Sequence, residues 1–210
     1  MFRGTFYRRF VLGEWAAAEG LVYDFFGPEL VQPVPESLDG PWYISCDYGT
    51  VNPTSMGLWG QKGGVWYRTA EFYYDSRKTG RQQTDGEYAD DLARLAGGRD
   101  IRGVVLDPSA ASFREELIRR GWMVYRAENE VLSGIRRTAE LLRAGQLVIC
   151  SPCEDAIREF GLYRWDTAAT GDRVVKEHDH AMDDIRYFAV TVAGRRSEGF
   201  FAGAVERGGG

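Results

Sequence analysis

The sequence lacks both glycine-rich motifs by which proteins commonly bind nucleotides. Neither G-x-x-x-x-G-K-[ST] nor G-x-G-x-x-G occurs in its 210 residues, so no ATP site of the usual kind is expected. No apolar run approaches the roughly 20 residues that a membrane-spanning helix needs. The first residues, MFRGTFYRRFVLGEW, lack the apolar core of a signal peptide. We therefore expect a protein that is not secreted, makes no membrane contact and works in the cytoplasm.

Cysteine and lysine are scarce. The three cysteines are odd in number, which argues against a disulfide framework, and the Cys150-Ser-Pro-Cys153 pair has no second pair or nearby histidine to complete a zinc site. The net charge of −5 argues against a general high-affinity nucleic-acid binder. The charge is compatible with a nuclease that has acidic residues in its active site and basic residues around the rim of that site. The preference for arginine over lysine suits phosphate binding, but GC-rich codon usage would produce it too.

The chain divides into three parts by composition. Residues 1–40 are aromatic, basic and then proline-rich, ending in GPELVQPVPESLDG, which is typical of an extended connector. Residues 41–194 have the regular alternation of apolar runs and turns expected of one folded domain. Residues 195–210, rich in glycine, are predicted to form a flexible tail.

The order of elements within 41–194 predicts the fold class. Strands are expected at 43–48, 54–61, 65–74, 103–106, 122–126 and 147–150. Helices are expected at 82–96, 112–121, 131–144, 152–163 and 179–193, and residues 167–177 form a loop or small hairpin. Three hairpin-linked strands followed by alternating helices and strands predict an α/β fold with a mixed sheet flanked by helices. This order fits an RNase H-like core better than a doubly wound nucleotide-binding fold.

Three aspartates stand at the ends of predicted elements. Asp47 and Asp107 each end an apolar strand, and Asp183 lies in the first turn of the last helix. Alone, each could be a turn residue or a helix-start acid. Brought together they would repel one another unless divalent cations neutralised them, and their hard oxygen ligands suit Mg²⁺ or Mn²⁺. The arrangement predicts a site for phosphate chemistry, in which two ions roughly 3.5–4 Å apart would activate a water.

Other residues near these aspartates are weaker candidates. His180 shares a helix face with Asp183 and could orient it, contact phosphate or assist proton transfer, unless it is only a solvent-exposed histidine. Asp184 could be a further metal ligand or an ion-pair partner. Asp179 is explained better as the helix N-cap. In the polar loops, Lys78, Arg173 and Lys176 could contact the DNA backbone, although solvated surface residues look the same.

The motifs together resemble a known family. DYGTVNPT, LDPSAASF, GIRRTAELL and DHAMDDIRY, in this order, look like the C-terminal nuclease domain of tailed-bacteriophage terminase large subunits. The segment YRRFVLGEWAAAEGLVY is similar to the one that joins that family's ATPase to its nuclease. The resemblance covers roughly residues 5–194.

The resemblance implies an RNase H-like endonuclease that cuts concatemeric double-stranded DNA during viral genome packaging in the host cytoplasm, with little sequence selectivity. Its acidic triad would be Asp47, Asp107 and Asp183, with His180 as the motif histidine. Two Mg²⁺ or Mn²⁺ ions would be bridged by Asp47 and held by the other two. The implied partners are DNA, the terminase ATPase domain, the small terminase subunit and the portal.

One departure limits the comparison. The family's full protein has an N-terminal ATPase, and this chain has none of its motifs, so we expect an excised nuclease domain with residues 1–40 as a connector remnant. Two alternatives stay open. One is another RNase H-like nuclease, such as a junction resolvase or an RNA–DNA hybrid nuclease. The other is a non-catalytic module that docks or positions DNA.

Overall fold

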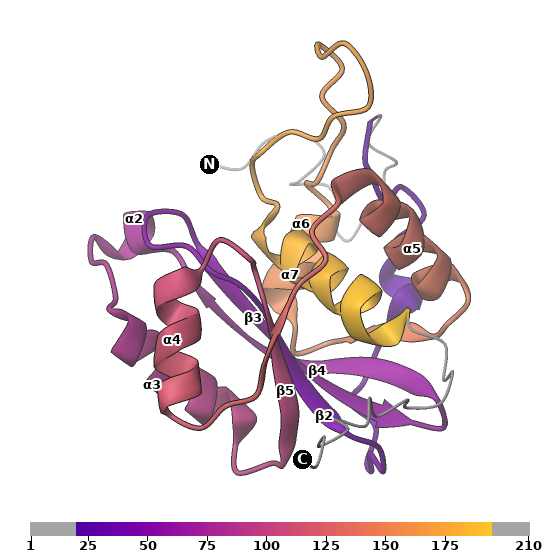
Figure 1. Ribbon diagram of the computed structural model, residues 1–210. Helices are drawn as coiled ribbons and strands as arrows, with labels where there is room; N and C mark the ends of the chain where they lie inside the picture. Colours follow the sequence, from indigo (N-terminus) through magenta and orange to yellow (C-terminus); the bar gives the residue numbers. More distant parts are fainter. Residues whose placement is uncertain (1–19, 195–210) are drawn as a thin grey trace, which may run out of the picture.

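The centre of the fold is a seven-stranded mixed sheet in the order β1-β7-β4-β3-β2-β5-β6 (Figure 1). The structure is a computed structural model, and it describes residues 20–194. Strands β2, β3 and β4 pair antiparallel, while β5, β6, β7 and β1 join the sheet in parallel. The strands are β1 (Val31–Gln32), β2 (Trp42–Asp47), β3 (Thr54–Lys62), β4 (Val65–Tyr74), β5 (Ile101–Leu106), β6 (Val124–Arg126) and β7 (Leu147–Cys150). The mixed sheet predicted from the sequence is confirmed.

The hairpin between β3 and β4 follows directly from its turn sequence. Lys62 pairs with Val65, so Gly63 and Gly64 are the two turn residues, with φ angles of 57° and 83°. Two-residue hairpin turns with positive φ at both positions match the twist of the strands, and glycine adopts them without strain.

The helices lie on both faces of the sheet. They are α2 (Ser76–Thr79), α3 (Asp85–Ala96), α4 (Ala111–Arg119), α5 (Val131–Arg143), α6 (Glu154–Phe160) and α7 (His180–Phe188), with a 3-10 turn, η1 (Pro28–Leu30), and a π-helical turn, η2 (Ala189–Ala193). Among the described residues no helix is long and apolar enough to cross a membrane.

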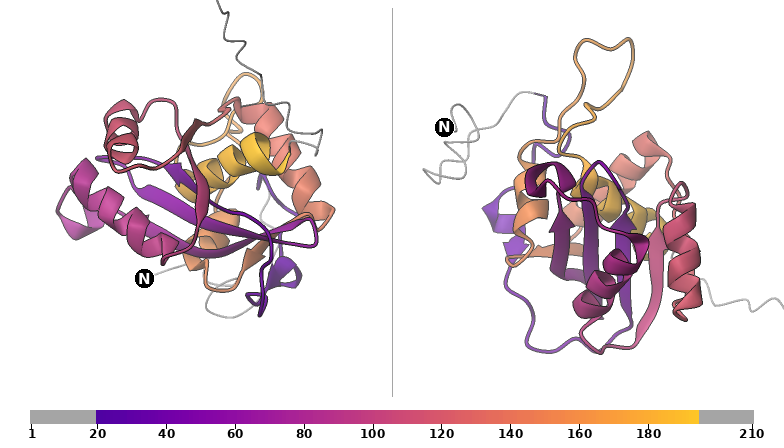
Figure 2. Two further views of the ribbon diagram at one scale, coloured as in Figure 1. Left: turned by 60° about the horizontal axis from the view of Figure 1, so that its bottom comes forward. Right: turned by 90° about the vertical axis from the view of Figure 1, so that its left-hand side faces the viewer.

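The helices form two groups, and each group packs on the sheet through its own hydrophobic cluster. One joins α3 and α4 to β2, β3 and β5 through residues such as Leu92, Phe113 and Ile44. The other joins α5, α6 and α7 to β3, β4 and β7 through residues such as Trp59 and Phe188, whose rings stack with centroids 4.2 Å apart. Figures 1 and 2 show the two groups of helices well apart, with the central strands between them.

Several helix boundaries differ from the predicted ones. Helix α3 begins at Asp85 because Thr84 and Glu87 form a capping box, which leaves the predicted first residues of this helix outside it. The helix predicted at 112–121 begins one residue earlier, as α4 at Ala111, and has no side-chain cap. Helix α6 is shorter than expected, and the predicted last helix is divided into α7 and η2. Residues 167–177, predicted to be a loop or small hairpin, form a projecting loop closed by a bridge between Trp165 and Val174 (Figures 1 and 2).

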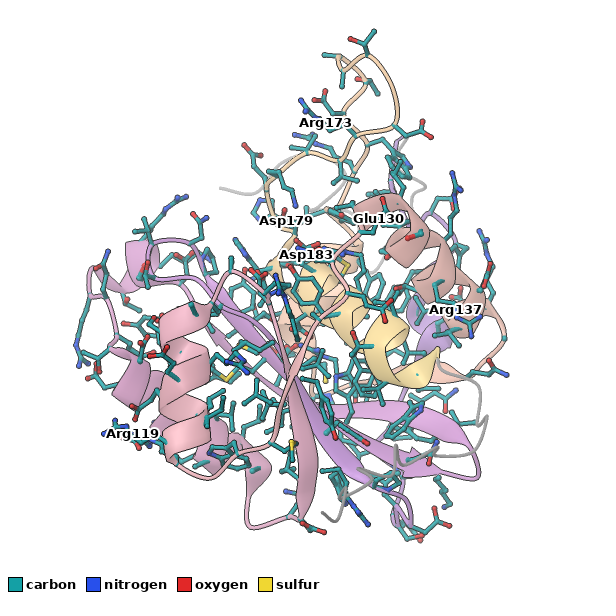
Figure 3. All side chains as sticks on the ribbon, in the orientation of Figure 1. Arg119, Glu130, Arg137, Arg173, Asp179 and Asp183 are labelled. Carbon is teal, nitrogen blue, oxygen red and sulfur yellow. The ribbon has the colours of Figure 1, made fainter. Side chains whose placement is uncertain are left out.

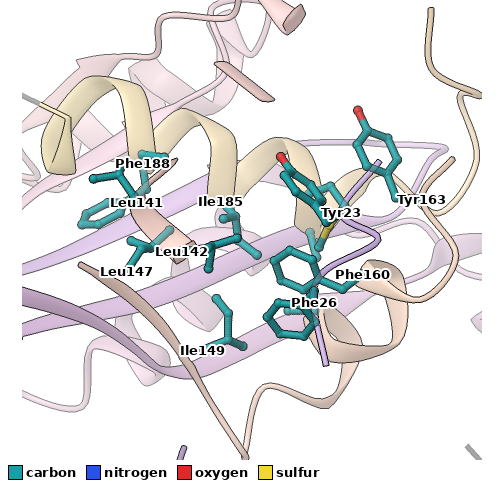
Figure 4. Packing of buried hydrophobic residues seen from close by; sticks show 14 of the residues in the cluster. Tyr23, Phe26, Leu141, Leu142, Leu147, Ile149, Phe160, Tyr163, Ile185 and Phe188 are labelled. Carbon is teal, nitrogen blue, oxygen red and sulfur yellow. The ribbon is translucent and has the colours of Figure 1, made fainter. Parts of the chain in front are cut away.

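Part of the segment predicted as a connector packs into the fold. Tyr23 and Phe26 are 1% and 2% exposed, and the Phe26 ring stacks on Phe160 of α6 with centroids 3.8 Å apart (Figure 4). Strand β1 pairs with β7 at the edge of the sheet. The packing therefore begins before the predicted boundary at Pro41. Residues 1–19 of the predicted connector and the predicted tail, 195–210, lie outside the described residues.

Candidate functional site

Three acidic side chains meet in one cleft of about 900 Å³. Asp47 is the last residue of β2, and Asp107 follows the last residue of β5. These strands are parallel neighbours, with Cys46 opposite Leu106, so both carboxylates leave the sheet at the same edge. Asp183 reaches the same cleft from α7, and Figure 3 shows it beside Asp179 at the base of the projecting loop.

Asp47 forms a pair with His180. The His180 Nδ1 atom lies 2.9 Å from the Asp47 carboxylate, and both side chains are largely buried, 18% and 13% exposed. Burial raises the pKa of Asp47 to about 7, and the nearby charges of Asp183 and Asp107 add to the rise. Burial lowers the pKa of His180, but the hydrogen bond and the charge of Asp47 outweigh it, so this pKa is raised. The pair can therefore bind and release a proton near neutral pH.

Asp183 is held by two cations. Arg186, one turn further along α7, approaches it to 2.9 Å, and Lys176 of the projecting loop approaches it to 3.3 Å. Lys176 also lies 3.2 Å from Asp179. Asp179 occupies the predicted N-cap position, but its side chain caps no backbone amide; its carbonyl accepts the amide of Asp183 instead.

Asp107 has a different set of contacts. Its carboxylate accepts hydrogen bonds from the backbone amide of Ser109 at 3.1 Å and from the Ser109 hydroxyl at 2.7 Å. A side chain that bonds the backbone two residues on forms an Asx turn. The turn holds the carboxylate at the mouth of the cleft.

Comparison with known proteins relates this arrangement to one family. No protein-family model matches the sequence, and no curated protein matches it. Among solved structures, the large terminase of a thermophilic bacteriophage, in complex with ADP, is 43% identical over 91% of this chain, with a TM-score of 0.80. The chain belongs to the large terminase family. It spans about half the length of that protein, 49%.

Two further structures share the fold of this chain. The P22 large terminase nuclease domain matches 82% of this chain and 92% of its own length, with 18% identity and a TM-score of 0.66. The large terminase nuclease of thermophilic phage G20c, with bound magnesium, matches 83% of this chain and 98% of its own length, with 16% identity and a TM-score of 0.61. At these identities the likeness concerns the fold, which is the RNase H-like fold of the terminase nuclease domain.

Asp184, a candidate metal ligand from the sequence, points away from the cleft. Its carboxylate is 0% exposed and accepts hydrogen bonds from Ser45, Ser55 and Arg68. The adjacent residue of a helix projects about 100° away, so with Asp183 in the cleft Asp184 faces the sheet. The prediction of a metal ligand is corrected here, because the carboxylate is engaged as the ion-pair partner of Arg68, the alternative that the sequence left open.

The candidate DNA-contacting residues do not all line the acidic cleft. Lys78 and Lys176 line it, but Arg173 lies at the neck of the projecting loop, beside the bridge between Trp165 and Val174 (Figure 3). Arg173 lines a second hollow of about 700 Å³ beside the start of α5, and Lys176 lines this hollow too.

The cleft also contains residues that were not predicted from the sequence. They include Arg158 of α6 and His178, the only residue besides glycine with a positive φ, 55°, in the described part of the chain. The position of His178 two residues before His180 was an available signal. Arg158 gave none, because only the tertiary fold brings α6 to the cleft.

The donor set of the cleft suits a hard divalent cation. Its acidic groups are carboxylates. Asp47, Asp107 and Asp183 lie close enough together that the charges of Asp107 and Asp183 raise the pKa of Asp47. In residues 20–194 no three histidine, cysteine or acidic side chains are arranged to hold one ion, since Asp183 is engaged by Lys176 and Arg186 and Asp107 by Ser109. The residues fit Mg²⁺ or Mn²⁺ chemically, once these contacts are exchanged for metal contacts. The three cysteines are buried, free thiols.

Proposed function

We propose that this chain is the nuclease part of a viral large terminase and that it hydrolyses phosphodiester bonds of concatemeric double-stranded DNA with little sequence selectivity. The observation that carries the proposal is the meeting of Asp47, Asp107 and Asp183 in one cleft, in a chain 43% identical to a large terminase. The partners proposed with it are the terminase ATPase domain, the small terminase subunit and the portal, and the proposed location is the host cytoplasm.

The proposed roles follow from the position of each side chain. Asp47, whose pKa is raised by burial and further by both of the other carboxylates, would share two divalent cations, while Asp107 and Asp183 would each hold one. When bound, such ions lower the pKa of a coordinated water and stabilise the charge on the leaving oxygen.

The residues of the chain have further parts in this scheme. His180, 2.9 Å from Asp47, orients that carboxylate and exchanges a proton with it near neutral pH. Lys78, Arg158 and His178 line the same cleft and would contact the phosphates of the DNA backbone. Contacts of this kind position a duplex without distinguishing its bases, which agrees with low sequence selectivity.

The test is nicking and linearisation of supercoiled plasmid in Mg²⁺, in Mn²⁺ and in EDTA. We expect cutting that requires the metal and is abolished in the variant Asp107→Asn. The matched control is Asp100→Asn, an exposed acid just before the first residue of β5, at the opposite end of the same strand. Cutting that survives in Asp107→Asn would contradict the proposal.

Substrate preference separates the proposal from its alternatives. A nuclease of packaging type prefers duplex DNA over an RNA–DNA hybrid and a four-way junction, whereas the other RNase H-like enzymes show the reverse order. A protein that binds duplex DNA but cuts none of the three, with or without a restored ATPase domain, would be a docking module.

A further inference from the structure

A buried polar network lies under the candidate site and holds helix α7 on the sheet. Its centre is Arg68 of β4, which is 0% exposed. The Arg68 guanidinium donates to both oxygens of Asp184 and, at 3.3 Å, to Glu71. The hydroxyls of Ser45 and Ser55 donate to the same two oxygens of Asp184. Asp184 thus receives four hydrogen bonds, and the carboxylate is satisfied without water.

The sheet is shaped to admit this arginine. The pairing of β3 and β4 shifts between Leu58, opposite Ala70, and Trp59, opposite Arg68, so that Thr69 is an extra residue. Side chains alternate along a strand, so Arg68 and Glu71 would otherwise face opposite sides. The bulge places both on the α7 side, which is what bulges near functional sites commonly do. Gly57 makes room for the arginine, because a Cβ atom there would lie 1.9 Å from its Nη1 atom.

The network continues to the neighbouring helix. Glu71 accepts the backbone amides of Asp155 at 2.6 Å and Ala156 at 3.3 Å, both in the first turn of α6. On the other side, the Trp59 indole donates to Ser45 at 2.8 Å while its ring stacks on Phe188 of α7. The contacts fix α6 to β4, and they fix α7 to β2, β3 and β4.

The sequence of α7 makes such an anchor necessary. Asp183 and Asp184 are adjacent and chemically identical, so a rotation of the helix by about 100° would exchange them. A buried ion pair adds little net stability compared with apolar residues, but it can select one arrangement over another. The Arg68 fork and the two hydroxyls accept a carboxylate only at position 184, and they thereby leave Asp183 and His180 to the cleft.

We propose that Arg68 is a positioning residue that decides which of the two adjacent aspartates faces the metal site. The inference rests on the proposed function, because it concerns the same cleft. Arg68 does not line the cleft and touches no candidate ligand there; it acts through Asp184 and α7.

The test uses variants of graded severity in the full chain. Arg68→Lys keeps the charge but loses the fork that reaches both Asp184 oxygens. Ser55→Ala removes one of the four hydrogen bonds. Thr138→Val is the control, since it removes a fully buried hydroxyl of α5 that donates to Gly134 of the same helix and has no contact with the network. Folding is checked by circular dichroism and melting temperature.

Two measurements then decide the inference. The first is the Mn²⁺ dissociation constant by calorimetry. This dissociation constant should rise roughly 10-fold in Arg68→Lys, which is the size of effect seen when a residue that orients a metal ligand is lost. It should rise by a smaller factor in Ser55→Ala. It should not change in Thr138→Val. The second is hydrogen exchange in EDTA, which should become faster in α7 of both network variants and stay unchanged in α3.

Folded network variants with unchanged Mn²⁺ affinity and unchanged α7 exchange would overturn the inference. If Arg68→Lys does not fold, Ser55→Ala decides by the same two measurements. If the parent protein binds no Mn²⁺, the proposed function fails, and the exchange measurement alone decides whether Arg68 anchors α7.

Discussion

Replacement of Phe26 by alanine tests whether the predicted connector is part of the folded unit. Phe26 is 2% exposed and stacks on Phe160 at a centroid distance of 3.8 Å, with an angle of 11° between the rings. Truncation of a buried phenylalanine costs about 3–5 kcal/mol, from lost burial and from the cavity that remains. A domain of this size loses roughly 2–4 °C of melting temperature per kcal/mol. We therefore expect a fall of roughly 6–20 °C in Phe26→Ala.

The assay is thermal unfolding followed by circular dichroism in EDTA, which keeps metal binding out of the measurement. Val34→Ala is the matched control, because Val34 lies in the same segment but is 40% exposed. A surface change of this kind is worth within about 0.5 kcal/mol. If Phe26→Ala melts within about 2 °C of the parent, residues 21–32 contribute nothing to the core, and the reasoning about the boundary is refuted. Deletion of 1–40 should then also leave the stability unchanged.

Three further predictions concern the cleft. The pKa of Asp47 is raised to about 7 and that of His180 is also raised, so both groups bind protons more tightly in the folded protein and its stability in EDTA falls as the pH rises from about 4 to above 7. Between pH 5 and pH 8 in EDTA, the melting temperature of Asp47→Asn should therefore fall less than that of the parent. Equal falls would contradict the assignment. Lys176→Met removes the cation 3.3 Å from Asp183 and should tighten Mn²⁺ binding, measured by calorimetry, by up to about threefold, because an ion pair with an exposed lysine contributes little free energy. The control variant Lys62→Met, at an exposed lysine, should not change Mn²⁺ binding. Lys78→Ala should weaken duplex binding for all sequences and lower by about one the slope of the logarithm of affinity against the logarithm of salt concentration. Arg173→Ala, outside the acidic cleft, should change neither the affinity nor this slope. Both are measured by fluorescence anisotropy at several salt concentrations.

The sequence was sufficient for the acidic cleft and for the sheet apart from β1. Apolar runs bounded by turn residues predicted the positions of β2, β3, β4 and β7 closely. Asp47 and Asp107 could be placed together because each directly follows such a run, and parallel neighbours end at one edge. These inferences need only local sequence and simple topology.

The sequence was insufficient wherever a β-bulge or packing against a distant helix determines where a side chain lies. Arg68 stands within β4, in the sequence VWYRTAEFYY, and nothing local shows that the extra residue Thr69 turns it toward α7 with Glu71. Asp184 could not be told from Asp183, because their difference lies in what each meets across the fold. Phe26 is found in a proline-rich segment whose composition predicts a connector, while its ring is buried by α6, far along the chain.

The cleft is arranged to limit the repulsion between its carboxylates. Asp47 lies against His180 with a pKa near neutrality, Asp183 is paired with Lys176 and Arg186, and Asp107 is turned into contact with Ser109. Each carboxylate thus has a proton or a donor in place of a metal ion. Divalent cations bound in the cleft would displace these partners, release a proton from the Asp47–His180 pair and free the exposed Lys176. Under the proposed function, this lysine would then be available to a phosphate of the substrate when the carboxylates no longer need it.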